Sequence, residues 1–266
     1  MARFQYAHIQ IVTTNWRGDF FVSLGYKHKM MSMQGTNQII KLFTIPYSGG
    51  NAYSFSEFKK HLPNNIELRS LELPGRGKRI QEQTLNNIQD MTSDLFKQMD
   101  LHDGERYAIY GHSLGALLAF TLCRLIESKG MNLPLALFVS GQPAPSRIKP
   151  DHKYRLPDNE FIDMLRDMGG TPDELLMEDS FVKYFLPIIR KDFQSIAHYK
   201  YSGYETQLNI PIKVFIGNKE QISIEDANAW QEESLFPISV FWFDGGHFFI
   251  FNNQKELCNI IVEQIK

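Results

Sequence analysis

Residues 111–115 have the sequence GHSLG, which places a serine between two glycines and could supply a nucleophile for acyl transfer. The residues before it, 106–110, are typical of a short buried strand, and residues 114–128 are typical of an apolar helix. Ser113 is therefore predicted on a tight, strained strand-to-helix turn with its hydroxyl above the sheet edge. Because a Cβ would crowd the neighbouring backbone, Gly111 and Gly115 are expected to provide the space.

A serine nucleophile needs a base, and His247 has the best setting among the eight histidines. It follows a predicted strand at 238–243 and the turn Asp244-Gly245-Gly246, and it precedes a predicted amphipathic helix at 255–265. In hydrolases whose triad runs serine, acid, histidine along the chain, the histidine lies on this last strand-to-helix loop. His112 is next to Ser113 in sequence but is expected to point away and pack in the core.

The acid that orients the histidine should follow a strand between Ser113 and His247. The segment 212–220 offers Glu220, three residues after Gly217 at the end of an apolar run. Asp226 and Asp244 are second choices, because one lies in a helical pattern and the other is too close to His247 in sequence. The alternative for Glu220 is a solvated loop charge.

The oxyanion of an attacked carbonyl requires two backbone N–H donors. Leu114, directly after the nucleophile, is expected to give one of them. Ser48, in the loop Pro46-Tyr47-Ser48-Gly49-Gly50 after the first patterned strand, is expected to give the other. A glycine-rich turn without a catalytic role is the alternative for this loop.

Strand and helix patterns alternate from residue 38 onward, which predicts an α/β fold with a mostly parallel central sheet covered by helices. The predicted strands and helices are strands 39–45, 66–71, 106–110, 135–139, 212–216 and 238–243, and helices 54–62, 85–99, 114–128 and 255–265. Residues 37–266 are expected to form one domain. Within it, residues 150–206 have helical patches and no convincing strand, which predicts an inserted helical lid hinged at Gly169-Gly170; ordinary core helices are the alternative.

Residues 1–36 lack a clear period and are expected to be a loose extension. Met30, Met31 and Met33 are alternative starts just before the patterned region, so the hypothesis is that this segment is translated from upstream of the true start.

The composition narrows the classes of partner. A net charge of −2 gives no electrostatic reason to expect binding to nucleic acid or an acidic membrane, and no apolar run is long enough to span a bilayer. Cys123 and Cys258 lie in apolar helical patterns without CxxC spacing, which favours buried thiols in a reducing cytoplasm. No metal and no cofactor of its own are expected.

Five motifs in register resemble the type II thioesterases, stand-alone α/β-hydrolase-fold enzymes that accompany nonribosomal peptide and polyketide synthetases. The motifs are 46–50 (PYSGG), 73–77 (LPGRG), 111–115 (GHSLG), 140–145 (SGQPAP) and 245–249 (GGHFF). The resemblance covers residues 40 to the C-terminus, and 190–193 with Tyr199 and Tyr201 resembles the family's lid-to-core segment. Glu220 departs from the family, which usually has aspartate there.

The resemblance implies hydrolysis of acyl groups stalled on the phosphopantetheine arm of carrier proteins, by a monomeric cytoplasmic enzyme. The partner would be a carrier protein domain of a synthetase, and the phosphopantetheine would belong to the substrate. Arg76, Lys78 and Arg79 would then meet the phosphate or an acidic carrier surface, or else form a solvated basic turn.

Three other functions stay open at this point. A cytoplasmic esterase or lipase acting on oxygen esters would use the same triad. A synthetase-linked acyl transferase or cyclase would differ only in the acceptor. A catalytically silent binding protein with this fold would usually have lost Ser113 or His247, and both residues are present.

Overall fold

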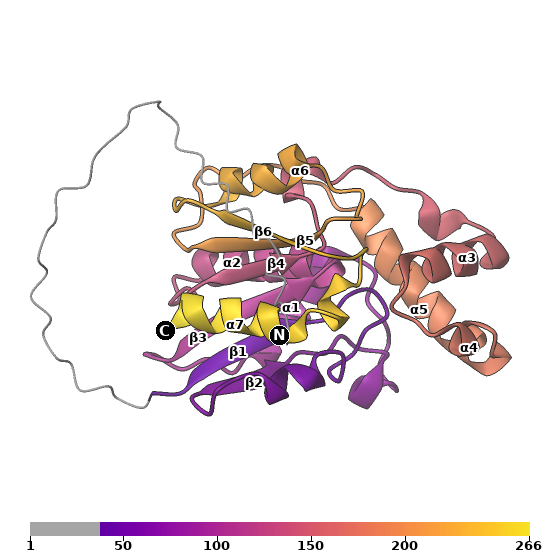
Figure 1. Cartoon of the computed structure of the whole chain (residues 1–266), viewed down its shortest axis with the longest axis horizontal. Coiled ribbons are helices and arrows are strands. Elements are labelled where there is room, and N and C mark those ends of the chain that lie inside the picture. The colour runs from indigo at the N-terminus through magenta and orange to yellow at the C-terminus, as the bar shows by residue number, and fades with distance from the viewer. Residues whose placement is uncertain (1–37) are drawn as a thin grey trace, which may run out of the picture.

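The computed structural model describes residues 38–266, so the expectation for residues 1–36 lies outside the described residues. The described chain contains a six-stranded sheet in the order β2-β1-β3-β4-β5-β6 (Figure 1). All of its strand pairs are parallel. The strands are β1 (Ile40–Ile45), β2 (Ile66–Ser70), β3 (Arg106–His112), β4 (Leu137–Ser140), β5 (Ile212–Gly217) and β6 (Ser239–Phe243).

Helices cover both faces of this sheet. The helices of the described residues are α1 (Ile88–Gln98), α2 (Leu114–Ser128), α3 (Asp158–Met168), α4 (Asp173–Leu176), α5 (Asp179–Ala197), α6 (Ile224–Asn228) and α7 (Gln254–Ile265), of which α1 and α2 pack on one face and α7 on the other. Successive side chains of β3 alternate between the faces: Tyr107 and Ile109 pack with α1 and α2, whereas Ala108 and Tyr110 pack with α7. This double burial explains the continuous apolar runs from which the strands were predicted.

The α/β fold with a parallel sheet is confirmed, and two local predictions differ from the structure. The predicted helix at 54–62 is a short 3-10 turn, Ser56–Lys60, in which Phe58 alone is buried. A single buried side chain gives a helix too little apolar contact to extend it. The helix predicted from residue 85 begins at Ile88, where the Asn87 side chain accepts a hydrogen bond from the Asp90 amide and caps it.

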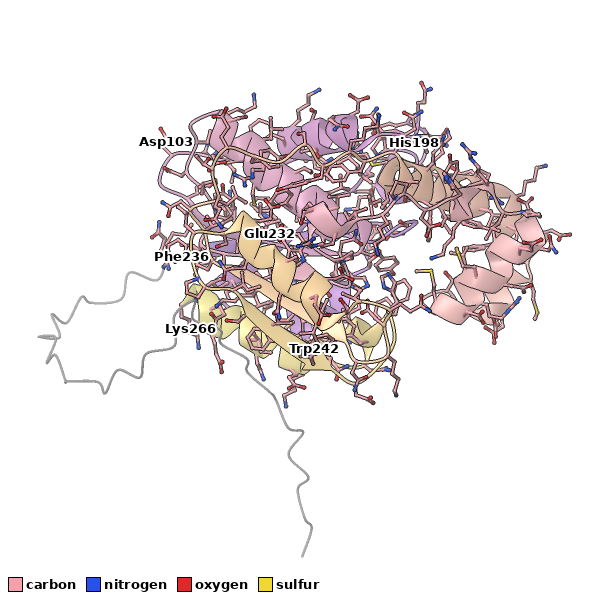
Figure 2. All side chains as sticks on the ribbon, turned by 90° about the horizontal axis from the view of Figure 1, so that it is seen from above. Asp103, His198, Glu232, Phe236, Trp242 and Lys266 are labelled. Carbon is pink, nitrogen blue, oxygen red and sulfur yellow. The ribbon has the colours of Figure 1, made fainter. Side chains whose placement is uncertain are left out.

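Three helices inserted between β4 and β5, namely α3, α4 and α5, project beyond one end of the sheet, and Figures 1 and 2 show this from two directions. They have an apolar cluster of their own, formed by Phe161, Leu165, Leu176, Leu186 and Ile189. The insertion is therefore helical, as predicted, and packs as a unit distinct from the two sheet-face clusters. We refer to α3–α5 as the lid.

The turn from β3 into α2 has the strained geometry expected for the serine. Ser113 has φ 57° and ψ −120°, a positive φ that side-chain-bearing residues rarely adopt. A Cβ on Gly111 would lie 2.0 Å from the Gly115 carbonyl oxygen, and a Cβ on Gly115 would lie 2.1 Å from the Ile45 carbonyl oxygen. The two glycines thus allow α2 to begin against the ends of β3 and β1.

Gly111→Ala should lower the free energy of unfolding by about 1–3 kcal/mol or more, because the new methyl overlaps backbone that has no room to move. Urea denaturation measures the change. Gly246→Ala is the matched control, since a Cβ there meets no atom within 4 Å, and it should stay within about 0.5 kcal/mol of the wild type. Equal stability of the two variants would contradict this packing argument.

Candidate active site

A narrow cavity of about 30 Å³ lies where the strands end and the lid meets the sheet. Ser113 and His247 both line it, and so does Ser48 from the loop after β1. The apolar walls come from the lid and from the two loops, and they are Tyr47, Leu165, Met168, Ile189, Phe193 and Phe248. Three segments that are far apart in sequence therefore bring the predicted nucleophile, base and oxyanion loop to one space.

Glu220 lies behind His247, as the sequence predicted for the acid. Its Oε2 is 3.4 Å from His247 Nδ1, and its side chain is only 3% exposed. Its Oε1 accepts a hydrogen bond from the Gly217 amide at 3.1 Å, which fixes the longer glutamate side chain in the turn after β5. The solvated-charge alternative for Glu220 is therefore wrong.

The second-choice acids are placed elsewhere. Asp244 is exposed and pairs with Lys219 at 3.2 Å, while Asp226 is half-buried in α6. The His247 imidazole thus has one buried carboxylate at its Nδ1. No hydrogen bond joins Ser113 to His247 among the described residues, and such contacts often tighten only when substrate binds. The catalytic role of each residue stays a prediction.

The two predicted oxyanion donors are free to act. Within residues 38–266, no acceptor binds the amide of Ser48 or that of Leu114. The neighbouring Gly49 amide is engaged: it donates to Asp192 Oδ2 at 2.8 Å. Of these two neighbouring amides, the Ser48 N–H is therefore the one without an acceptor among the described residues, and Ser48 lines the cavity.

His112 is fully buried, as expected for a packing residue, but it also contacts the predicted base. Its ring centroid lies 4.9 Å from that of His247, and its Nδ1 lies 2.9 Å from Ser140 Oγ. Burial, followed by repulsion from His247, holds the pKa of His112 well below its usual value. No local sequence pattern indicates this contact, because it depends on how the β6–α7 loop folds back.

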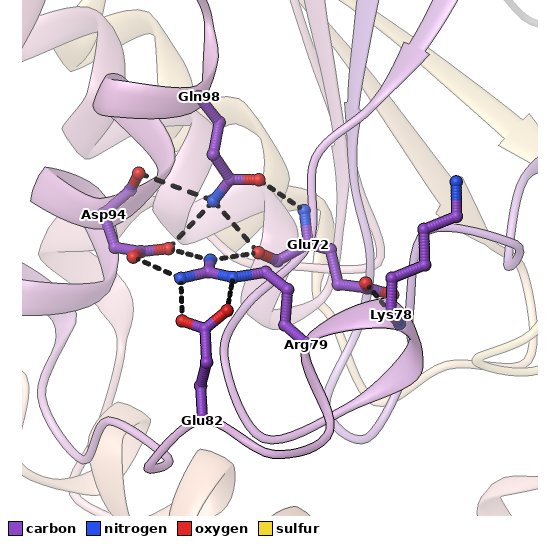
Figure 3. Close-up of polar contacts among 6 residues, drawn as sticks. All are labelled: Glu72, Lys78, Arg79, Glu82, Asp94 and Gln98. Atoms are coloured by element: carbon purple, nitrogen blue, oxygen red, sulfur yellow. Dashed lines mark hydrogen bonds and ion pairs between the residues drawn. The ribbon is translucent and has the colours of Figure 1, made fainter.

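Within the basic turn at 76–79, Arg76 differs from both sequence-based interpretations. Arg76 is only 1% exposed and forms a bidentate ion pair with Asp192, so it is neither solvated nor open to a phosphate. Arg79 binds Glu82 and Asp94 and donates to the Glu72 carbonyl, as Figure 3 shows. Lys78 is exposed and lies over the Tyr53 ring, so it is the most accessible of these three residues to a partner.

Three other observations describe what the rest of the described chain contains. No group of three or more potential metal-ligating side chains gathers among residues 38–266. Cys123 and Cys258 are both buried and unpaired, as the sequence indicated, and burial raises the pKa of Cys258 to about 12. Among the described helices, none has the length and apolarity needed to cross a bilayer.

Known proteins resemble this chain over most of its length. The family model for the thioesterase domain matches residues 40–265. The gramicidin S biosynthesis protein GrsT of Aneurinibacillus migulanus is 34% identical over 229 residues, which is 85% of this chain and 89% of GrsT.

Solved structures agree with this match. The structure of ClbQ from the colibactin NRPS/PKS pathway superposes with a TM-score of 0.81 at 31% identity, covering 86% of this chain and 97% of ClbQ. The type II thioesterase BorB from the borrelidin biosynthetic cluster superposes with a TM-score of 0.78 at 31% identity, covering 86% of this chain and 93% of BorB.

The buried His112 should make stability depend on pH. Below about pH 6.5 the unfolded chain binds a proton that folded His112 does not, so stability falls as the pH falls, by up to about 1.4 kcal/mol per pH unit. His112→Gln should remove this contribution and give a shallower decline between about pH 6 and pH 5. Urea denaturation across this range measures both slopes, with the exposed His102→Gln as control. Equal slopes for wild type and His112→Gln would refute the assignment.

Proposed function

The chain belongs to the thioesterase family, and we propose that it hydrolyses acyl groups from the phosphopantetheine arms of carrier proteins in nonribosomal peptide or polyketide synthesis. The observation that carries this proposal is the convergence of Ser113, His247 and Ser48 on one cavity, with Glu220 behind the histidine and no acceptor for the Ser48 amide within residues 38–266. These are the parts that acyl transfer to a serine requires.

In the proposed reaction, Ser113 Oγ attacks the thioester carbonyl carbon while His247 takes the hydroxyl proton. The carbonyl oxygen becomes an oxyanion that accepts hydrogen bonds from the Ser48 and Leu114 amides. The carbon–sulfur bond then breaks, and the thiol leaves with a proton from His247. Because a thiol has a pKa of about 8.5, this departure needs less acid assistance than that of an alcohol.

Deacylation repeats these steps with water. His247 removes a proton from water as it attacks the acyl-serine, and the proton then passes to Ser113 Oγ as the ester bond breaks. Glu220, 3.4 Å from His247 Nδ1, would orient the imidazole and stabilise its cation in both halves. The mechanism needs no metal or cofactor of the enzyme, since the phosphopantetheine arrives on the substrate.

The partner in this proposal is an acyl or peptidyl carrier protein. We further propose that the enzyme acts as a monomer in the cytoplasm. The two unpaired buried cysteines fit a reducing compartment, and gel filtration with and without carrier tests the monomer.

Ser113→Ala and His247→Ala should each lower the hydrolysis of an acetylated carrier protein by at least about 10³-fold. Glu220→Gln should lower it by at least about 10²-fold, because the amide keeps the size of the side chain but not its charge. Release of free acetate measures the rates, and the exposed Glu225→Gln should match wild type. A Glu220→Gln rate within about twofold of wild type would assign the acid role to another residue.

The leaving group provides a second test. With one acyl group presented as a carrier thioester and as an oxygen ester, kcat/KM should be higher for the carrier thioester, since the thiol leaves more readily. Chromatography of the released products, with an alcohol and an amine acceptor present, should show the free acid as the main product. Preference for the oxygen ester would indicate an esterase, and a dominant acceptor conjugate would indicate a transferase.

A further inference from the structure

Arg76 and Asp192 form a buried ion pair between the turn after β2 and the lid helix α5. Arg76 Nη1 lies 2.6 Å from Asp192 Oδ2, and Arg76 Nη2 lies 2.9 Å from Asp192 Oδ1. The side chains are 1% and 0% exposed. A bidentate pair of this kind fixes the carboxylate in orientation as well as in position.

The same carboxylate also holds the loop that provides the predicted oxyanion donor. Asp192 Oδ2 accepts the Gly49 amide at 2.8 Å, one residue after Ser48. Gly49 has φ +78°, and a Cβ on it would lie 2.6 Å from Ile189 Cγ1 on the same helix. The backbone at 48–49 is thus fixed by a hydrogen bond and by close packing on α5.

A second buried carboxylate holds this loop from its other side. Glu72, shown with its neighbours in Figure 3, accepts the Ala52 amide at 2.9 Å through Oε1 and the Lys78 amide at 2.8 Å through Oε2. The side chain of Glu72 therefore links the loop after β1 to the turn that carries Arg76. Glu72 and Asp192 together fix both ends of the 49–52 segment.

We propose that Arg76 and Asp192 are positioning residues for the oxyanion hole: Arg76 orients Asp192, and Asp192 takes the Gly49 amide so that the Ser48 amide faces the cavity. This inference rests on the proposed function, because it assigns a role to groups around the same site. Neither residue lines the cavity, so each acts through the loop.

The ion pair of Arg124 and Glu233 provides a matched control. It is also buried, with side chains 6% and 1% exposed and a separation of 3.4 Å, and neither residue lines the cavity or binds the loop after β1. Glu233→Gln therefore removes a buried charge without touching the oxyanion donors.

Asp192→Leu should lower kcat for an acetylated carrier by about 10²-fold with little change in KM, because the transition state loses a positioned donor. Asp192→Asn should recover part of this loss, since its amide oxygen still accepts the Gly49 N–H. Glu233→Gln should keep the wild-type kcat even where its melting temperature falls.

Asp192→Leu leaves Arg76 buried without a partner, so the double variant Arg76→Met/Asp192→Leu removes both charges and protects the fold. It should melt near the wild-type temperature and remain about 10²-fold slow in kcat. A double variant with the wild-type kcat would overturn the positioning role. So would a kcat in Asp192→Asn no higher than in Asp192→Leu, or an equal loss in Glu233→Gln.

These outcomes are separate from the failure of the proposed function. If Ser113→Ala keeps the wild-type rate, the proposed function is wrong whatever the Asp192 variants do. If Ser113→Ala is inactive and the double variant is as fast as wild type, only the positioning role is wrong.

Discussion

The close approach of α2 to the ends of β1 and β3 fixes the geometry on which the site depends. Because Gly111 has no side chain, the Gly115 carbonyl can lie against it. Because Gly115 has no side chain, the Ile45 carbonyl can lie against it in the same way. Because Ile45 ends β1, one contact sets both the position of Ser113 and the point where the Ser48 loop begins. The predicted nucleophile and the two predicted oxyanion amides therefore share one rigid frame, and the strained backbone of Ser113 is held in place by the surrounding packing.

Two buried carboxylates, those of Asp192 and Glu72, then hold the loop after β1. A buried charge is costly unless hydrogen bonds and opposite charge satisfy it. Asp192 is satisfied by Arg76 and the Gly49 amide, and Glu72 by the Ala52 and Lys78 amides. Since these amides would otherwise lack partners, the charges and the loop stabilise each other. An irregular loop at an active site gains order in this way without an apolar core of its own.

Local patterns were sufficient for the parallel sheet, the strained serine turn and the lid helices. The placement of Ser48, Glu220 and His247 followed from chain order, because strands in a parallel sheet finish at one edge. The burial of Arg76 is not predictable from local sequence, because its partner lies 116 residues away in the lid and no local pattern joins LPGRG to Asp192. The packing of His112 is predictable from its position beside Ser113, yet its contact with His247 depends on the fold of a glycine turn that residue spacing does not specify.

The lid helix α5 has two segments. The segment after Pro187 is held against the loop after β1, and the segment before Pro187 is not. Pro187 lies inside the helix and lacks the amide that would continue the helical hydrogen bonds. The residues after Pro187 include Ile189 and Asp192, which are held against the loop after β1. The cavity of about 30 Å³ has room for about two water molecules, so an acyl chain needs additional space. If the cavity were enlarged by moving the segment after Pro187, the Ser48 amide would be displaced. We therefore expect space for substrate to come from movement of α3, α4 and the start of α5, which would leave the two predicted oxyanion amides in place.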